Sequence, residues 1–175
     1  MSQRAYQDNL TGLANRQQFV IAFENSVKMS IQKKRNISLL LIDLNGLKQI
    51  NQIHGHKSGD LVISTFASLL SQCILFSDQV FRYGGDQFVV ILNQTEETSI
   101  SALVEHICHL LDSNIIMEEF DITCSIGRAD VKEYDDFNSL IERTEQSLSI
   151  IKNVQLSEDA DQVEYPLYDL VANGN

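Results

Sequence analysis

Two short apolar runs separated by a pair of glycines constrain the fold of this chain more than any other feature. Residues 79–83 and 87–92 both have the composition of strands, and Gly84-Gly85 lies between them. A glycine-containing turn between two such runs is a hairpin signal, because glycine tolerates the backbone angles of tight turns. The sequence therefore favours an antiparallel or mixed sheet.

The remaining elements alternate around this hairpin. Apolar residues at helical spacing predict helices over 16–34, 47–53, 98–112 and 137–152, and a further helix that Ser58 caps and that carries Leu61 to Leu70. Short apolar or alternating runs predict two more strands, Ile37–Leu44 and Phe120–Ile126. Some strands are separated by helices, and one hairpin joins two others. This order predicts an α+β fold with a central, mostly antiparallel sheet and helices packed on it.

Composition bounds the class of protein. A chain of 175 residues with 43% hydrophobic residues suits one globular domain. A formal net charge of −11 argues against a nucleic-acid binder, since phosphate backbones need a basic surface. An acidic protein can still bind a nucleoside triphosphate if a divalent metal bridges the charges.

Several features indicate a cytoplasmic domain with no membrane contact of its own. No run of 18 apolar residues is present, and the first residues lack the apolar core of a signal peptide. Cys73, Cys108 and Cys124 form no CxxC pair, so buried free thiols in a reducing compartment are expected. The acidic stretch 157–161 and the single proline, Pro166, predict a tail or linker over 157–175 after a domain that spans 1–156.

Two carboxylates carry the chemistry. Asp43 stands near the end of a buried strand, and Asp86 follows the Gly-Gly turn. Acids on adjacent strand ends repel each other unless a cation lies between them. Magnesium held by carboxylates and substrate phosphates is a common device for phosphoryl or nucleotidyl transfer, and glycines let a phosphate approach the backbone. A tight hairpin with an acidic turn residue is the simpler alternative.

Five segments, in order and in register from about residue 8 to 152, resemble the GGDEF domain family of diguanylate cyclases. They are Asp8–Arg16 (DNLTGLANR), Leu41–Asn51 (LIDLNGLKQIN), Gly55–Asp60 (GHKSGD), Phe81–Phe88 (FRYGGDQF) and Ser125–Gly127 (SIG). The resemblance implies a ferredoxin-like, nucleotidyl-cyclase palm. It also implies that two facing domains each supply one GTP, and that the pair makes cyclic di-GMP and pyrophosphate.

The resemblance also implies roles for individual residues. Asp43, Asp86 and the Leu44 carbonyl would hold Mg²⁺ or Mn²⁺, within a catalytic signature of Gly84, Gly85, Asp86 and Gln87. Asn51 and Asp60 would contact the guanine edge, while Lys48 and Lys152 would contact the phosphates. Alternatives remain open at this point. Asn51 and Asp60 are also good helix-capping residues, and Lys48 is equally compatible with a solvated surface lysine.

The sequence departs from the family pattern at several positions. Gln87 replaces an acid, and an amide cannot act as a base. Leu156 stands where a phosphate-binding arginine is expected, and Gln155 replaces the glycine before it. Residues 75–78, at the place of the product-inhibition motif RxxD, keep Asp78 but lack the arginine, so tight cyclic di-GMP binding is not expected at that surface.

Three functions are compatible with this pattern. The first is a slow diguanylate cyclase that works as a homodimer. The second is a catalytically degenerate domain that binds GTP and regulates a linked sensory or phosphodiesterase module. The third is a docking domain without a nucleotide. Zinc at His54 and His56, or at His106 and His109, is not expected because no further ligand falls at suitable spacing.

Overall fold

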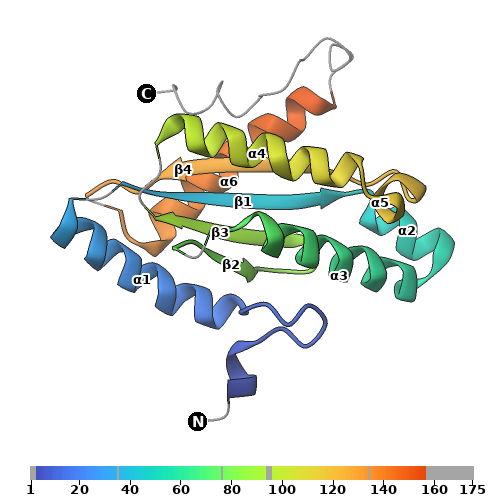
Figure 1. Cartoon of the computed structure of the whole chain (residues 1–175), viewed down its shortest axis with the longest axis horizontal. Helices are drawn as coiled ribbons and strands as arrows, with labels where there is room; N and C mark the ends of the chain where they lie inside the picture. The colour runs from blue at the N-terminus through green and yellow to red at the C-terminus, as the bar shows by residue number, and fades with distance from the viewer. Residues whose placement is uncertain (1–2, 35, 76, 94–95, 134, 157–175) are drawn as a thin grey trace.

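A single antiparallel sheet organises the molecule. The computed structural model describes residues 3–34, 36–75, 77–93, 96–133 and 135–156. These residues form a four-stranded sheet in the order β2-β3-β1-β4 (Figure 1). The strands are β1 (Ile37–Asn45), β2 (Gln79–Arg82), β3 (Gln87–Asn93) and β4 (Thr123–Asp130). The predicted α+β class and the hairpin between β2 and β3 are confirmed.

Helices cover both faces of the sheet. A short 3₁₀ helix (Gln3–Tyr6) comes first, and α1 (Arg16–Lys33) and α6 (Phe137–Gln155) pack on one face. The opposite face carries α2 (Leu47–His54), α3 (His56–Cys73), α4 (Glu97–Asp112) and α5 (Ile115–Glu119). Figure 1 shows α3 and α4 crossing in front of the sheet, with α6 behind it. Within the described part of the chain, no helix combines the length and hydrophobicity of a membrane span.

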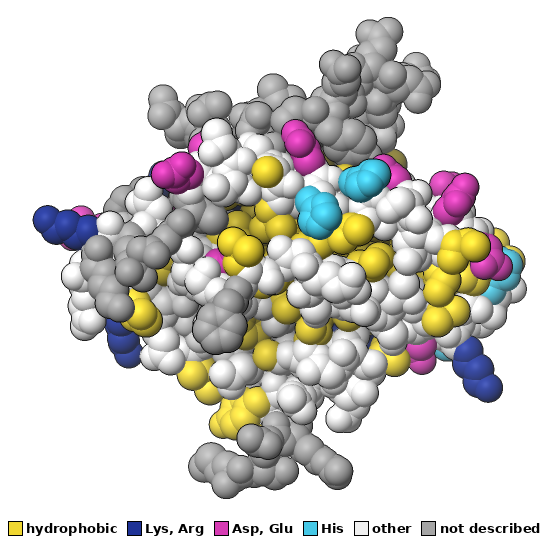
Figure 2. All heavy atoms as spheres, viewed as in Figure 1, with side chains coloured by type: hydrophobic (Ala, Val, Ile, Leu, Met, Phe, Trp, Pro, Cys, Tyr) yellow, Lys and Arg dark blue, Asp and Glu magenta, His cyan; other side chains and the backbone are white. Residues whose placement is uncertain are grey.

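The surface over α3 and α4 carries few basic side chains. Figure 2 shows hydrophobic side chains interspersed with polar ones on this face, and the visible Lys and Arg side chains stand near its edges. This distribution agrees with a chain that has 24 acidic residues against 13 lysines and arginines.

Strand β1 is buried on both faces, which explains its unbroken apolar sequence. Leu40 and Ile42 belong to the core under α3 and α4, whereas Leu39 and Leu41 belong to the core under α1 and α6. Side chains alternate between the two faces of a strand. Asp43 therefore lies on the face that α6 covers, in line with Leu39 and Leu41.

Two local expectations were wrong. The strand expected over 120–126 begins only at Thr123, because α5 precedes it and Phe120 caps that helix. Asp121 then takes a φ of 51°, which no strand residue adopts. Helix α3 begins at His56 after Gly55, whose φ is 82°, so Ser58 is not its cap. The Ser58 hydroxyl instead donates to the His54 carbonyl oxygen at 3.2 Å.

The expectation for the cysteines is confirmed only in part, and the expectation for the C-terminal segment stays a prediction. The three cysteines are free, but only Cys124 is buried, while Cys73 and Cys108 are half-buried. The tail or linker expected over 157–175 lies outside the described residues.

Candidate functional site

A row of polar side chains crosses three strands at one end of the sheet. Asp43 on β1 is paired in register with Gln87 on β3 and with Ser125 on β4. Residues directly opposite each other on antiparallel strands project to the same side of the sheet. All three side chains therefore face α6, which passes over this end of the sheet. Asp43 comes from a strand otherwise filled with apolar residues, so its presence needs a polar partner or a function.

Both carboxylate oxygens of Asp43 have protein partners. The ammonium group of Lys152, on α6, lies 2.8 Å from Oδ1. The Gln87 amide donates from Nε2 to Oδ2 at 3.1 Å. Only 6% of Asp43 is exposed, whereas the Lys152 side chain is 37% exposed. The buried negative charge is thus balanced by a lysine that solvent still reaches.

Asp86 occupies the turn of the β2–β3 hairpin beside this row. Its backbone carbonyl accepts a hydrogen bond from the Leu44 N–H at 3.0 Å, which fixes the turn against the end of β1. Burial, and then the charge of Asp43, raise the pKa of the Asp86 carboxyl group. Its own backbone N–H and the Lys152 charge act in the opposite direction. The negative charge of Asp43 thus acts on Asp86 in the direction of mutual repulsion.

The two glycines of the turn provide space rather than unusual backbone angles. Neither Gly84 nor Gly85 is among the residues with positive φ. A Cβ atom built on Gly85 would meet nothing within 4 Å, and one on Gly84 would meet only the Gln87 side chain at 3.6 Å. The turn thus exposes its backbone to any group that approaches from solvent.

Arg82 holds this turn in place. Its guanidinium donates to the Gly85 carbonyl at 2.9 Å and to the Gly84 carbonyl at 3.3 Å. It also pairs with Asp8 at 2.9 Å. The Asp8 carboxylate in turn accepts hydrogen bonds from Thr11. Sequence reasoning missed this link because Asp8 and Arg82 lie 74 positions apart and no local pattern connects them.

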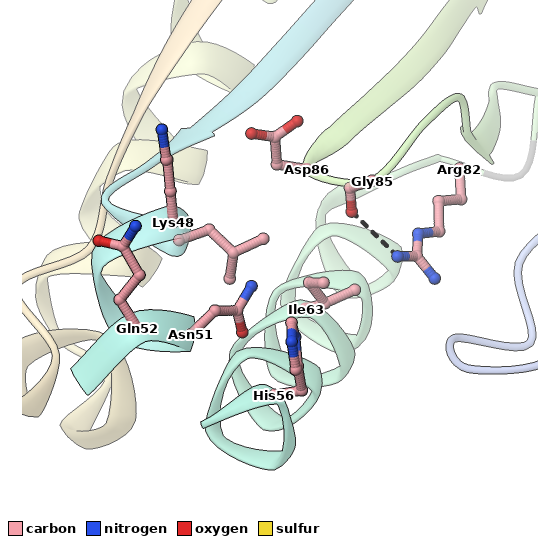
Figure 3. Close-up of a pocket in the computed structure, with 9 residues that line it drawn as sticks. Lys48, Asn51, Gln52, His56, Ile63, Arg82, Gly85 and Asp86 are labelled. Carbon is pink, nitrogen blue, oxygen red and sulfur yellow. Dashed lines mark hydrogen bonds between the residues drawn. The ribbon is translucent and has the colours of Figure 1, made fainter. Parts of the chain in front are cut away.

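A pocket of about 460 Å³ lies between this turn and helices α2 and α3. Its volume falls within the usual range for small-molecule sites. The predicted residues Lys48, Asn51, Gly85 and Asp86 line it, and Figure 3 shows them with Arg82 on its far side. Sequence reasoning assigned no ligand contact to the other lining residues, which are Leu47, Gln52, His56 and Ile63. Asp43 and Lys152 lie outside this lining.

Asn51 projects into the pocket from α2. A Cβ atom at Gly59 would stand 2.0 Å from Asn51 Oδ1, so only glycine lets α3 pack this closely against the amide. Oδ1 is buried and has no hydrogen-bond partner in the described structure. A buried polar atom without a partner is costly and uncommon in a folded protein. The Asn51 side chain is therefore a candidate for contact with a polar ligand.

The capping alternative for Asn51 and Asp60 is wrong. Asn51 lies inside α2 and Asp60 inside α3, while the N-caps of these helices are Gly46 and Gly55. Asp60 is exposed on the first turns of α3, next to Gly59, and is not part of the pocket lining.

The C-terminal end of α6 carries a polar contact in place of a charged one. Leu156, where an arginine was expected, is 85% exposed. Gln155 accepts a hydrogen bond from the Ser125 hydroxyl at 2.5 Å and donates to the Cys124 carbonyl at 3.3 Å. Gln155 thus ties the last turn of α6 to β4, one turn beyond Lys152.

Asp78, the remaining acid of the RxxD position, has a structural role. Its carboxylate accepts a hydrogen bond from the Asn93 N–H at 2.8 Å, which closes the open end of the β2–β3 hairpin. Burial raises the pKa of this carboxyl group.

The donor set at the end of β1 fits a hard divalent cation in combination with an anionic ligand. Among the described residues, no group of three or more His, Cys, Asp or Glu side chains is placed to hold a metal. Asp43 on β1 and Asp86 in the hairpin turn nevertheless place two oxygen-donor carboxylates at the same end of the sheet, where the Leu44 N–H holds the Asp86 carbonyl. Magnesium is usually bound by one or two carboxylates together with substrate phosphates. The Leu44 carbonyl, next to Asp43, remains a predicted third ligand.

Comparison with known proteins gives a consistent result. Residues 5–157 match the family described as diguanylate cyclase, GGDEF domain. The diguanylate cyclase DgcS of Shewanella oneidensis is 34% identical over 148 residues, which are 85% of this chain and 50% of that protein. DgcM of Escherichia coli K12 is 34% identical over 149 residues, with 85% of this chain and 36% of that protein covered. The chain thus spans half or less of these two relatives.

A solved structure shares the fold. The coiled coil and GGDEF domain of DgcB from Caulobacter crescentus, in complex with c-di-GMP, superposes with a TM-score of 0.80 and 28% identity. The match covers 86% of this chain and 82% of that one.

Proposed function

Since the chain belongs to the GGDEF domain family of diguanylate cyclases, we propose that it binds GTP with Mg²⁺ or Mn²⁺ and converts it slowly to cyclic di-GMP as a homodimer. The observation that carries this proposal is that Asp86, whose carbonyl is hydrogen-bonded to the Leu44 N–H at the end of the Asp43 strand, lines the same pocket as Asn51. Gln87 is the reason for the low rate.

Each residue has a role in this proposal. Asp43, Asp86 and the Leu44 carbonyl hold the divalent cation, which offsets the charge of the phosphates and of the departing pyrophosphate. Asn51 in the pocket and Asp60 beside it bind the guanine edge. Asp60 accepts hydrogen bonds from guanine N1–H and N2–H₂, a donor pair that adenine lacks, so it favours GTP over ATP.

The phosphates have two further contacts in the proposal. Lys48 lines the pocket, and Lys152 stands at the Asp43 carboxylate. Gly84 and Gly85 leave the hairpin turn open, so that the triphosphate can approach its backbone. The main contributions to catalysis are the positioning of the two substrates and electrostatic stabilisation of the α-phosphate of the transferred nucleotidyl group.

The arrangement around Gln87 supports a low rate. The 3′-hydroxyl of one GTP must lose a proton as it attacks the α-phosphate of the other. Gln87 presents an amide that is hydrogen-bonded to Asp43 and cannot take that proton. Leu156 adds no charge at the phosphate end. The same two observations favour a second candidate, a GTP-binding domain without turnover that regulates a linked module.

Two measurements on the same chain separate these functions. Incubation with GTP and Mg²⁺ or Mn²⁺, followed by chromatography, is expected to give a small amount of cyclic di-GMP. Saturating GTP with Mg²⁺ is expected to raise the melting temperature by about 5 °C or more, because only the folded chain binds it. A rise without product at high protein concentration favours the regulatory candidate. No rise and no product would leave only a protein-docking role.

A further inference from the structure

Lys152 balances the charge of Asp43, the carboxylate that the proposed function assigns to a metal ion. The two charged groups are 2.8 Å apart, and Gln87 occupies the other carboxylate oxygen. Each carboxylate oxygen can accept more than one contact, so a metal ion at Asp43 competes with Lys152 mainly through the repulsion between the two positive charges. The inference below rests on the proposed function, because it concerns the same metal and nucleotide.

The two partners of Asp43 differ in how easily they can move away. The Gln87 backbone is held in β3 and accepts hydrogen bonds from the N–H groups of Tyr83 and Gly84 at 2.9 and 3.2 Å. Lys152 instead lies one turn from the end of α6, and its long side chain is partly in solvent. A half-exposed ion pair contributes little free energy, and the ammonium group regains hydration when it moves into solvent, so Lys152 can leave at low cost.

The local charge balance favours an exchange of cations. Asp43 and Asp86 carry two negative charges, and Gln87 adds none. With Lys152 in place, the net charge of the group is about −1 at neutral pH, against −2 without it. A divalent ion that approaches is attracted by the carboxylates but repelled by the ammonium group. The pair of Lys152 with Asp43 consequently weakens metal binding as long as no phosphate draws the lysine away.

We propose that Lys152 is a displaceable counter-ion, which leaves Asp43 when a divalent cation binds and then pairs with the nucleotide phosphates. In this arrangement, the metal and the nucleotide each favour the binding of the other. Gln155 positions the exchange, because it anchors the end of α6 to Ser125 while Lys152 changes partner. Lys152 is thus both a competitor of the metal and a ligand of the substrate.

The proposal predicts effects of opposite sign for a single substitution. Lys152→Gln removes the charge but keeps an amide that can donate to Asp43. Without nucleotide, the variant is expected to bind Mn²⁺ about tenfold more tightly than the wild type, measured by electron paramagnetic resonance of free Mn²⁺. A suitable nucleotide is 3′-deoxy-GTP, which cannot be cyclised because it lacks the attacking hydroxyl. The affinity of the variant for 3′-deoxy-GTP in the presence of Mg²⁺ is expected to fall by about the same factor. Lys152→Arg keeps the charge and should resemble the wild type.

Lys132→Gln is the matched control, because it removes the same charge at the other end of β4. It should change neither affinity. Equal Mn²⁺ affinity of Lys152→Gln and wild type would overturn the counter-ion role and leave the proposed function intact. Absence of Mn²⁺ and nucleotide binding in all variants, including the wild type, would overturn both.

A second measurement needs no variant. An amine-acetylating reagent, followed by peptide mass spectrometry, reports how accessible each lysine is. Mg²⁺ alone should increase the acetylation of Lys152 in the wild-type chain and leave that of Lys132 unchanged. An unchanged rate at Lys152 under Mg²⁺ concentrations that saturate the site would contradict the displacement.

Discussion

The two ends of the sheet both carry buried charge, but they handle it differently. At one end Arg128, with a side chain only 5% exposed, is paired with Glu97 at 2.5 Å and with Asp130 at 2.9 Å. A second bond from its Nε reaches Asp130 at 3.0 Å. At the other end Asp43 has one half-exposed lysine as its ion-pair partner, and Asp86 has none among the described residues.

The comparison separates a closed ionic network from an open one. The Arg128 guanidinium forms ion pairs with two acids, one on β4 and one on α4. The Ser38 hydroxyl donates a further hydrogen bond to Asp130 at 2.6 Å. A ligand would gain little there. At the Asp43 end, Asp86 has no ion-pair partner among the described residues and Asn51 Oδ1 has no hydrogen-bond partner, so a cation and a nucleotide can add interactions there.

The largest effect is expected at the Asp43 end of the sheet, on turnover. Gln87→Glu restores an acid that can accept a proton, so turnover of GTP to cyclic di-GMP should rise by roughly 10²–10⁴-fold. The same change places two acids opposite each other on β1 and β3, and should lower stability in the absence of metal. Turnover and thermal unfolding with and without Mg²⁺ measure both effects.

Gln72→Glu, an exposed change at the end of α3, is the control for added charge and should leave turnover unchanged. No gain in Gln87→Glu would place the defect elsewhere, at Leu156 or in the pairing of two domains.

A substitution at the Arg128 end should change the stability of the fold but not nucleotide binding. Arg128→Met removes several charge-assisted hydrogen bonds from a buried guanidinium, and should lower the free energy of unfolding by about 2–3 kcal/mol. Urea unfolding measures this loss, with the exposed Lys132→Met as control. The variant should keep the rise in melting temperature caused by GTP and Mg²⁺. Loss of nucleotide binding in a folded Arg128→Met chain would break the distinction between the two ends.

A smaller effect is expected in the pocket. Gly59→Ala places a methyl group where Asn51 Oδ1 now lies, and the amide must move. Affinity for GTP with Mg²⁺ should fall by about tenfold, a loss typical of one or two hydrogen bonds. Calorimetric titration measures it, and Asn51→Ala should give a loss of the same size. Full affinity in both variants would remove Asn51 from the nucleotide site.

The smallest effect concerns the support of the turn. Burial acts to raise the pKa of Asp8, but the Arg82 guanidinium and the hydrogen bonds from Thr11 outweigh it, so this pKa is lowered. A lowered pKa in the folded state stabilises the fold at pH values above the unfolded pKa, and this contribution disappears as the pH falls through the folded pKa. It should amount to about 1 kcal/mol or less.

Unfolding of wild type and Asp8→Asn, measured from pH 7 down to about pH 3, tests this contribution. The two stabilities should converge at the acidic end, because protonated Asp8 and the asparagine that replaces it are both neutral. A difference that stays constant over the whole range would mean that the charge of Asp8 is unimportant.

Much of the fold could be predicted from local patterns. The apolar run of β1, the helical spacing in α3 and the glycine pair between β2 and β3 each carry a strong signal, and the antiparallel class followed from them. Helix α5 was missed because five residues are too few for a clear period. The start of β4 was misplaced because the apolar alternation continues back through Phe120, where the chain is still turning.

The candidate site divides in the same way. The residue types at Asp43, Asp86 and Asn51, and the loss of an acid at Gln87, are properties of the sequence, since their chemistry belongs to the side chains themselves. The partners of these residues cannot be read from the sequence. The pairing of Lys152 with Asp43 depends on where α6 crosses β1, and the alignment of Gln87 with Asp43 depends on strand register. Long-range packing fixes both, and a local pattern carries no information about contacts between residues so far apart in the chain.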